Sequence, residues 1–168
     1  MLKSKDFTIL LDEEEQRRGE DEVAAATRLL KRIMKNYPRA FNIMIVDGLY
    51  ARASFFELAL SYRKDIIAVL KDDRRELLQD AKGIFEGSKP SYVYTNKRKI
   101  IKCWDMEDFE SWDTLKGKVR VVRTVEETTI TRQNGKKEEA NRSEWYWVST
   151  ITKERLGTED FVNLGHSR

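Results

Sequence analysis

An aspartate and a glycine that follow an apolar run are the residues of this sequence best placed to do chemistry. In the stretch FNIMIVDG, residues 41–48, Asp47 is the first charged side chain and Gly48 comes directly after it. A carboxylate at the end of a strand can bind a hard cation such as Mg²⁺, provided that a further carboxylate lies nearby. The same pair is also a common turn, because aspartate tolerates turn geometry and glycine allows positive φ. On spacing alone, the turn is the favoured interpretation.

The elements around Asp47 are predicted to form parallel β-α-β units. Residues 41–46 are apolar on both faces, which is typical of an interior strand covered by helices. A helix over residues 51–62, a second buried strand over 65–70 and a helix over 73–85 follow, and this alternation favours a parallel sheet. Ligands of such sheets bind at the carboxyl ends of the strands, where Asp47 stands.

Periodicity and end signals predict two further helices. Residues 20–37 begin with acidic and continue with basic side chains, which complements the helix dipole, and Pro38 ends the element. Ser54 is the expected N-cap of the helix over residues 51–62, and Thr158 is that of a helix near the C-terminus. The apolar stripe of the first helix, at spacings of three and four, consists of Val23, Ala26, Leu29, Leu30, Ile33 and Met34.

Between Ser91 and Ile151 the sequence predicts antiparallel β-structure. This part is rich in Tyr, Val, Thr, Ile and Trp. Asn134-Gly135 lies between two β-prone stretches and is the strongest short-range signal for a hairpin. Trp145 and Trp147 are two residues apart, so we expect them on the same face of a strand.

The composition excludes several classes of protein. Of 168 residues, 36% are charged and 40% apolar, which is too apolar for a disordered chain and too charged for a membrane protein. We therefore expect a soluble cytoplasmic protein without membrane contact. One cysteine, Cys103, and one histidine, His166, cannot assemble a Cys/His zinc site. The net charge of +3 allows nucleic-acid binding without requiring it.

Three stretches of the sequence resemble insertion-sequence DDE transposases. IVDGLYARASFFELALSYRKDIIAVLKDDRRELLQDA, residues 45–81, looks like the region around their second catalytic aspartate, where one strand ends in Asp-Gly/Ala-x-Tyr and the next in Leu-Lys. GEDEVAAATRLLKRI, residues 19–33, resembles the helix that precedes that strand. LGHSR, residues 164–168, is similar to the segment just before their catalytic glutamate. The resemblance thus extends over nearly the whole chain.

This resemblance implies an α/β fold of the ribonuclease H-like type, with a mixed sheet flanked by helices and a β-rich antiparallel insertion. Residues 1–90 would then be a partial core, 91–151 the insertion and 152–168 the start of the final core helix. Such enzymes use two aspartates and one glutamate to hold two Mg²⁺ or Mn²⁺ ions for DNA cleavage and strand transfer, and Asp47 matches the second aspartate. The implied partners are DNA at transposon ends and, in a full-length enzyme, further copies of the chain.

The catalytic set implied by the resemblance is incomplete. Neither Asp6 nor Asp12 sits at a convincing equivalent of the first aspartate, and the glutamate is expected a turn beyond Arg168. We therefore expect a transposase fragment that does not cut DNA by itself. Two alternatives stay open: a catalytically dead remnant that binds DNA or a partner protein, and a small doubly wound domain that binds a nucleotide or phosphoryl group at Asp47. The latter lacks a glycine-rich phosphate loop.

Basic residues near these motifs are candidate DNA contacts. Lys71 ends its strand, and Tyr50 and Arg52 follow Asp47 closely enough to line the same cleft, although ordinary surface and packing roles explain them as well. A basic run from Asn96 to Lys102 is suited to backbone phosphates, and a charged sheet edge that prevents aggregation explains it equally. The predicted DNA-binding residues are Arg52, Lys71, Lys97, Arg98, Lys99 and Arg168.

Overall fold

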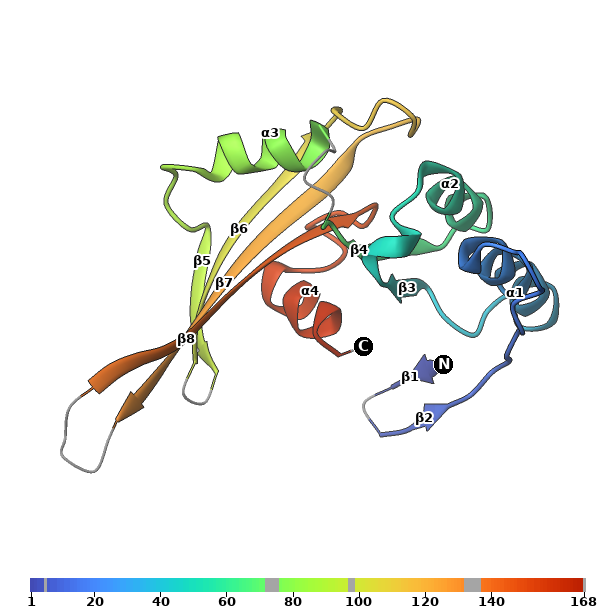
Figure 1. Cartoon of the computed structure of the whole chain (residues 1–168), viewed down its shortest axis with the longest axis horizontal. Helices are drawn as coiled ribbons and strands as arrows, with labels where there is room; N and C mark the ends of the chain where they lie inside the picture. The colour runs from blue at the N-terminus through green and yellow to red at the C-terminus, as the bar shows by residue number, and fades with distance from the viewer. Residues whose placement is uncertain (5, 72–75, 97–98, 132–136, 168) are drawn as a thin grey trace.

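The protein folds around a six-stranded mixed sheet with helices on both faces (Figure 1). The structure is a computed structural model that describes residues 1–167 except 5, 72–75, 97–98 and 132–136; of 129–131 and 137–140 it describes the backbone alone. Its elements are β1 (Leu2–Lys3), β2 (Thr8–Ile9), α1 (Glu22–Asn36), β3 (Ile43–Val46), the 3₁₀ turn η1 (Gly48–Tyr50), α2 (Ala53–Ser61), β4 (Asp65–Val69), α3 (Glu76–Phe85), β5 (Tyr92–Asn96), β6 (Lys99–Phe109), β7 (Val119–Thr131), β8 (Lys137–Ser149) and α4 (Thr158–Gly165).

The strand order in the large sheet is β3-β4-β8-β7-β6-β5, while β1 and β2 form a separate antiparallel pair. β3 and β4 are parallel and are connected through α2, which confirms the predicted β-α-β unit. β8 pairs antiparallel with β4, and β7, β6 and β5 continue the sheet with antiparallel pairing. The α/β class is therefore confirmed. The predicted division at residues 90 and 151 stays a prediction, although strands from both sides of residue 90 share one sheet.

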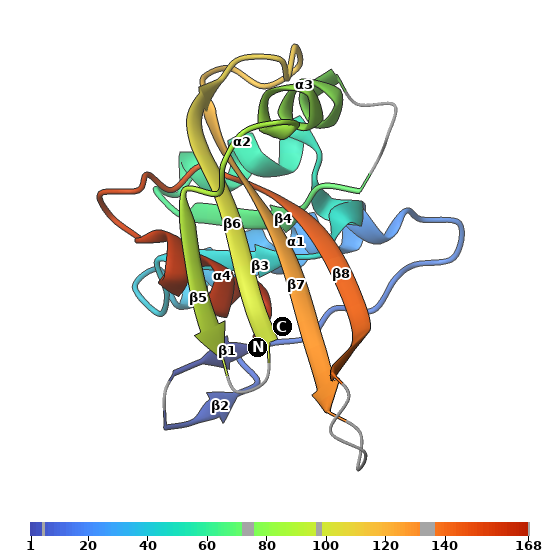
Figure 2. The same ribbon diagram turned by 90° about the vertical axis from the view of Figure 1, so that its left-hand side faces the viewer.

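β4 is the centre of the core, because all five of its residues are buried. Its side chains alternate between the faces of the sheet, as a strand requires. Ile66 and Ala68 pack with residues of α1, α2 and α3, whereas Ile67 and Val69 pack with residues of α4. Figures 1 and 2 show the consequence: α3 and α4 lie against opposite faces of the long strands.

β3 is a strand, as predicted, but the prediction of an interior position was wrong. It stands at the end of the described sheet, pairs there with β4 alone, and all four of its residues are partly exposed. An apolar pattern on both faces of a strand indicates that its side chains are shielded from water. It does not indicate whether the backbone is hydrogen-bonded to a neighbouring strand on one side or on both.

The predicted helices are present, although residues 73–75 of the predicted helix 73–85 lie outside the described residues. In α1, the Asp21 carboxylate caps the helix by accepting the N–H of Val23 at 2.6 Å. The predicted N-caps Ser54 and Thr158 were wrong: α2 and α4 begin after Arg52 and Gly157, and neither of these residues supplies a capping side chain. Among the described residues, no helix is both long enough and apolar enough to cross a membrane.

The predicted hairpin is confirmed by the antiparallel pairing of β7 with β8, although Asn134-Gly135 itself lies outside the described residues. These two strands extend as an arm beyond the rest of the sheet (Figures 1 and 2). Trp145 and Trp147 share one face of β8, as predicted, with ring centroids 6.0 Å apart.

A buried ion pair attaches α4 to the sheet. Arg120 of β7 donates two hydrogen bonds to Asp105 of β6, at 2.9 and 2.7 Å, and the exposed fractions of the two side chains are 2% and 1%. The Thr158 hydroxyl donates to the same carboxylate at 2.6 Å, and Arg120 also donates to the carbonyl of Leu156. The guanidinium lies 4.7 Å from the ring centroid of Phe161 in α4. Each charge is thus desolvated but fully paired.

We predict that Asp105→Asn destabilises the fold by about 3 to 5 kcal/mol, because it leaves the Arg120 charge buried without its counter-ion. Urea denaturation measures this loss. The matched control is Glu110→Gln, which removes a carboxylate from an exposed ion pair with Lys118 and should leave the unfolding midpoint unchanged. Equal effects of the two substitutions would contradict the prediction.

Candidate functional site

The candidate site lies where β3 and β4 end side by side. The parallel register pairs Val46 with Ala68, so the residues that follow each strand emerge at the same edge of the sheet. Asp47 follows β3 and is the N-cap residue of η1, and its carboxylate accepts the N–H of Gly48 at 2.5 Å. Lys71, which comes shortly after β4, brings its ammonium 3.4 Å from the same carboxylate oxygen. Both side chains are about half exposed, at 52% and 55%.

Gly48 is needed at this edge for space. A Cβ atom on this residue would lie 2.9 Å from the carbonyl oxygen of Val69, which is closer than real Cβ contacts come. The glycines with positive φ in the described chain are Gly19, Gly87 and Gly117. The favoured interpretation of Asp47-Gly48 as a turn is confirmed by η1, whereas the positive φ expected of Gly48 was wrong. Its missing side chain lets the end of β3 approach the end of β4, and this approach brings Asp47 near Lys71.

Hydrogen bonds join the loop that carries Asp47 to the start of α1. Tyr50 donates its hydroxyl to Glu22 at 2.5 Å, and Arg52 forms an ion pair with Asp21 at 2.6 Å. Partial burial and the bond to Glu22 raise the pKa of Tyr50 to about 12. The backbone N–H of Val23 and the Arg52 guanidinium lower the pKa of Asp21. Tyr50 and Arg52, predicted to line a DNA cleft, thus already hold α1 against the loop.

The described residues do not provide a complete ligand set for Mg²⁺ or Mn²⁺. Among them, no group of three or more His, Cys, Asp or Glu side chains is close enough to hold a metal ion. Asp47 instead has the Lys71 ammonium beside it, and Asp12 forms a two-bond ion pair with Arg32 of α1. Mg²⁺ binds through hard oxygen ligands, of which Asp47 would supply one half-exposed carboxylate.

Two lysines of the basic run, Lys99 and Lys102 of β6, form ion pairs with the neighbouring strand β7. Lys99 pairs with Glu126 of β7 at 2.8 Å, and Lys102 pairs with Glu127 at the same distance. Cross-strand pairs of opposite charge stabilise a sheet, so the structure gives these lysines a partner without DNA. The predicted contacts Lys97, Arg98 and Arg168 lie outside the described residues.

A pocket beside Lys71 adds a second cation to this edge. Its volume is about 290 Å³, and its lining includes Lys71, Lys82 of α3 and Tyr146 of β8. Glu144 contributes one acidic side chain to the same wall. The lining therefore combines two lysines with two aromatic residues, Trp145 and Tyr146.

Besides the Asp105–Arg120 pair, sequence reasoning missed two other polar clusters. His166 lies 3.0 Å from Glu126, with its ring edge-on to Trp145 and Trp147, beyond the end of α4. The other cluster joins the acidic segment 12–20 to Arg28 and Arg32 of α1. The sequence feature that could have predicted the cluster of segment 12–20 is the spacing of Arg28 and Arg32, four residues apart on one helix face, together with the preceding run of carboxylates.

No protein-family model matches the sequence, and no curated protein is significantly similar to it. The likeness to DDE transposases described above therefore supports a proposal about function and does not establish a family.

We predict opposite effects for two glycine-to-alanine substitutions. Gly48→Ala should destabilise the protein by about 1 to 3 kcal/mol, because the new methyl group collides with backbone that cannot move away cheaply. Gly83→Ala is the matched control: Gly83 lies inside α3 with open space around it, and alanine there should stabilise by up to about 1 kcal/mol. Thermal unfolding monitored by circular dichroism measures both. A tolerated Gly48→Ala would refute the close approach.

Proposed function

We propose that this chain is the part of a DDE-transposase-type protein that carries its second aspartate, Asp47, and that by itself it binds DNA without cutting it. The proposal includes a ribonuclease H-like core, of which the parallel β3-β4 pair would be one side. DNA at transposon ends is the proposed substrate. Mg²⁺ or Mn²⁺ would bind at Asp47 only together with carboxylates outside the described residues.

One observation carries the proposal: Asp47 and Lys71 lie 3.4 Å apart at the carboxyl ends of two parallel strands. This is the edge at which α/β sheets place ligands. A carboxylate there suits a hard metal ion, and a lysine beside it suits the phosphate whose bond that ion would help to break. The resemblance of residues 45–81 to transposases names the same aspartate and the same lysine position.

The surface around Lys71 supports DNA as the substrate class. Lys71 is half exposed and its contact with Asp47 is long for an ion pair, so its ammonium stays accessible to a phosphate. Lys82 lies on the wall of the adjoining pocket. Contacts with phosphate position a protein on DNA regardless of sequence and weaken with added salt.

The alternative of a catalytically dead remnant agrees with the same geometry. Asp47 and Lys71 place a half-exposed cation where a phosphate can reach it, so binding is the activity that the described residues support. The hypothesis of a transposase part and that of a dead remnant differ only in whether further carboxylates complete a metal site with Asp47.

We predict that Lys71→Ala lowers affinity for duplex DNA several-fold and reduces the slope of log K against log salt by about 0.9, the value for one phosphate contact. Fluorescence anisotropy with a labelled duplex across salt concentrations measures both quantities. Lys102→Ala is the matched control, because it removes the same charge from a lysine already paired with Glu127; we expect a much smaller change.

The same samples, incubated with Mn²⁺, should leave the duplex uncut on a denaturing gel. Absence of DNA binding by the wild-type chain at low salt would refute the proposal. Cleavage that survives Asp47→Asn would show that Asp47 has no part in the reaction.

A further inference from the structure

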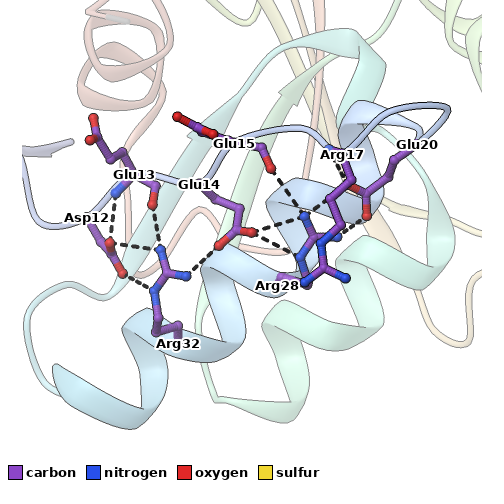
Figure 3. A network of polar contacts seen from close by, with 8 residues as sticks. All are labelled: Asp12, Glu13, Glu14, Glu15, Arg17, Glu20, Arg28 and Arg32. Atoms are coloured by element: carbon purple, nitrogen blue, oxygen red, sulfur yellow. Dashed lines mark hydrogen bonds and ion pairs between the residues drawn. The ribbon is translucent and has the colours of Figure 1, made fainter.

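The acidic segment of residues 12–20 wraps around two arginines of α1 (Figure 3). We call it the acidic strap. Arg32 donates to both oxygens of Asp12, at 2.6 and 2.9 Å, and forms an ion pair with Glu14. Arg28 donates to Glu14 at 3.0 Å and forms a two-bond ion pair with Glu20. The strap thus binds each guanidinium with two carboxylates.

Backbone carbonyls of the strap complete the coordination of the two arginines. Glu13 accepts a hydrogen bond from Arg32 at 2.5 Å, and Glu15 accepts one from Arg28 at 3.3 Å. In Figure 3 the carboxylates of Glu13 and Glu15 point away from both guanidinium groups. Alternate residues of the strap therefore play different parts: Asp12 and Glu14 provide charge, whereas Glu13 and Glu15 provide main-chain oxygens.

The strap is held mainly by charge. It contains no helix or strand, and of the apolar residues just before it, Leu11 packs against the core while Leu10 is 65% exposed. Asp12, Glu14 and Glu20 are the largely covered partners, with 22%, 14% and 16% of their side chains exposed. Hydrogen bonds from the arginines lower the pKa of Asp12 and of Glu14. A segment with few apolar contacts opens at low cost, and a stronger polyanion can compete for its cations.

The arrangement of Arg28 and Arg32 suits a phosphate group as well as it suits the carboxylates that they now bind. They are four residues apart on one helix, so both face the same side, and arginine forks match phosphate as well as carboxylate. The start of α1 is bonded to the Asp47 loop through Glu22 and Tyr50. At 1.5 Å per residue, the two arginines lie roughly 9 and 15 Å along the helix axis from Glu22.

We propose that the acidic strap is an internal substitute for a nucleic-acid backbone, which covers a DNA-binding surface at Arg28 and Arg32 and is displaced when duplex DNA binds. This inference rests on the proposed function, because it takes DNA as the partner. It adds a second contact surface for DNA and a competing acidic segment of the same chain that weakens DNA binding.

We predict that Asp12→Asn/Glu14→Gln raises affinity for duplex DNA about tenfold at moderate salt and steepens the salt slope by about 1 to 2. Both substitutions keep side-chain shape and remove the charges of two of the three carboxylates that hold the strap, leaving Glu20. Glu13→Gln/Glu15→Gln is the matched control, since it alters net charge equally in the same segment but leaves the carboxylates around the arginines in place. Adding Arg28→Gln/Arg32→Gln to the first variant should remove its gain.

Hydrogen exchange on the unmodified chain provides a second test that requires no variant to fold. Amides of residues 12–20 should exchange faster when duplex DNA is bound, while those of α1 stay protected. Equal gains from the two double variants, or an unchanged strap in the DNA complex, would refute the strap inference and leave the proposed function standing. If neither the wild type nor the variants bind DNA, the proposed function fails as well.

Discussion

The close approach of two parallel strand ends is the constraint on which the rest of the structure depends. The backbone of Gly48 lies against the carbonyl of Val69, at a distance that any side chain on residue 48 would prevent. This contact fixes where β3 stops relative to β4, and hence where Asp47 and Lys71 emerge. Through Tyr50 and Arg52 it also fixes the start of α1. The absence of a side chain at residue 48 thus allows β3, β4 and the start of α1 to lie in this arrangement.

β4 connects the β3–β4 edge to the rest of the sheet. Because it is parallel to β3 and antiparallel to β8, it joins a β-α-β unit to a long antiparallel meander. Such a junction must be covered on both faces, since every β4 side chain is buried. Helices α1, α2 and α3 cover one face and α4 covers the other. The buried Asp105–Arg120 pair fixes the position of α4, because Arg120 also donates to the carbonyl of Leu156 just before the helix. Apolar packing alone would allow α4 to slide along the sheet.

Local sequence patterns predicted the elements well and their environment less well. The spacing of Val23, Leu30 and Ile33 predicted α1, and the unbroken apolar run 66–70 predicted a buried strand, because each pattern is set by neighbours along the chain. The edge position of β3 and the reason for Gly48 could not be read in this way, because both depend on β4, some twenty residues later. The pairing of Lys99 with Glu126 could not be predicted either, because the two residues are 27 positions apart and only the strand register brings them together.

The same long-range pairing changes the meaning of the basic residues. In the sequence, the lysines of β6 and the arginines of α1 look like free cations, yet the fold gives Lys99, Lys102, Arg28 and Arg32 carboxylate partners of their own. A phosphate backbone would have to displace these carboxylates, so each such contact yields only the difference between two similar ionic interactions. Lys71 differs, because its contact with the Asp47 carboxylate is exposed and long. Selectivity for a polyanion therefore follows from how weakly each cation is already held, and the count of basic residues is a poor guide to it.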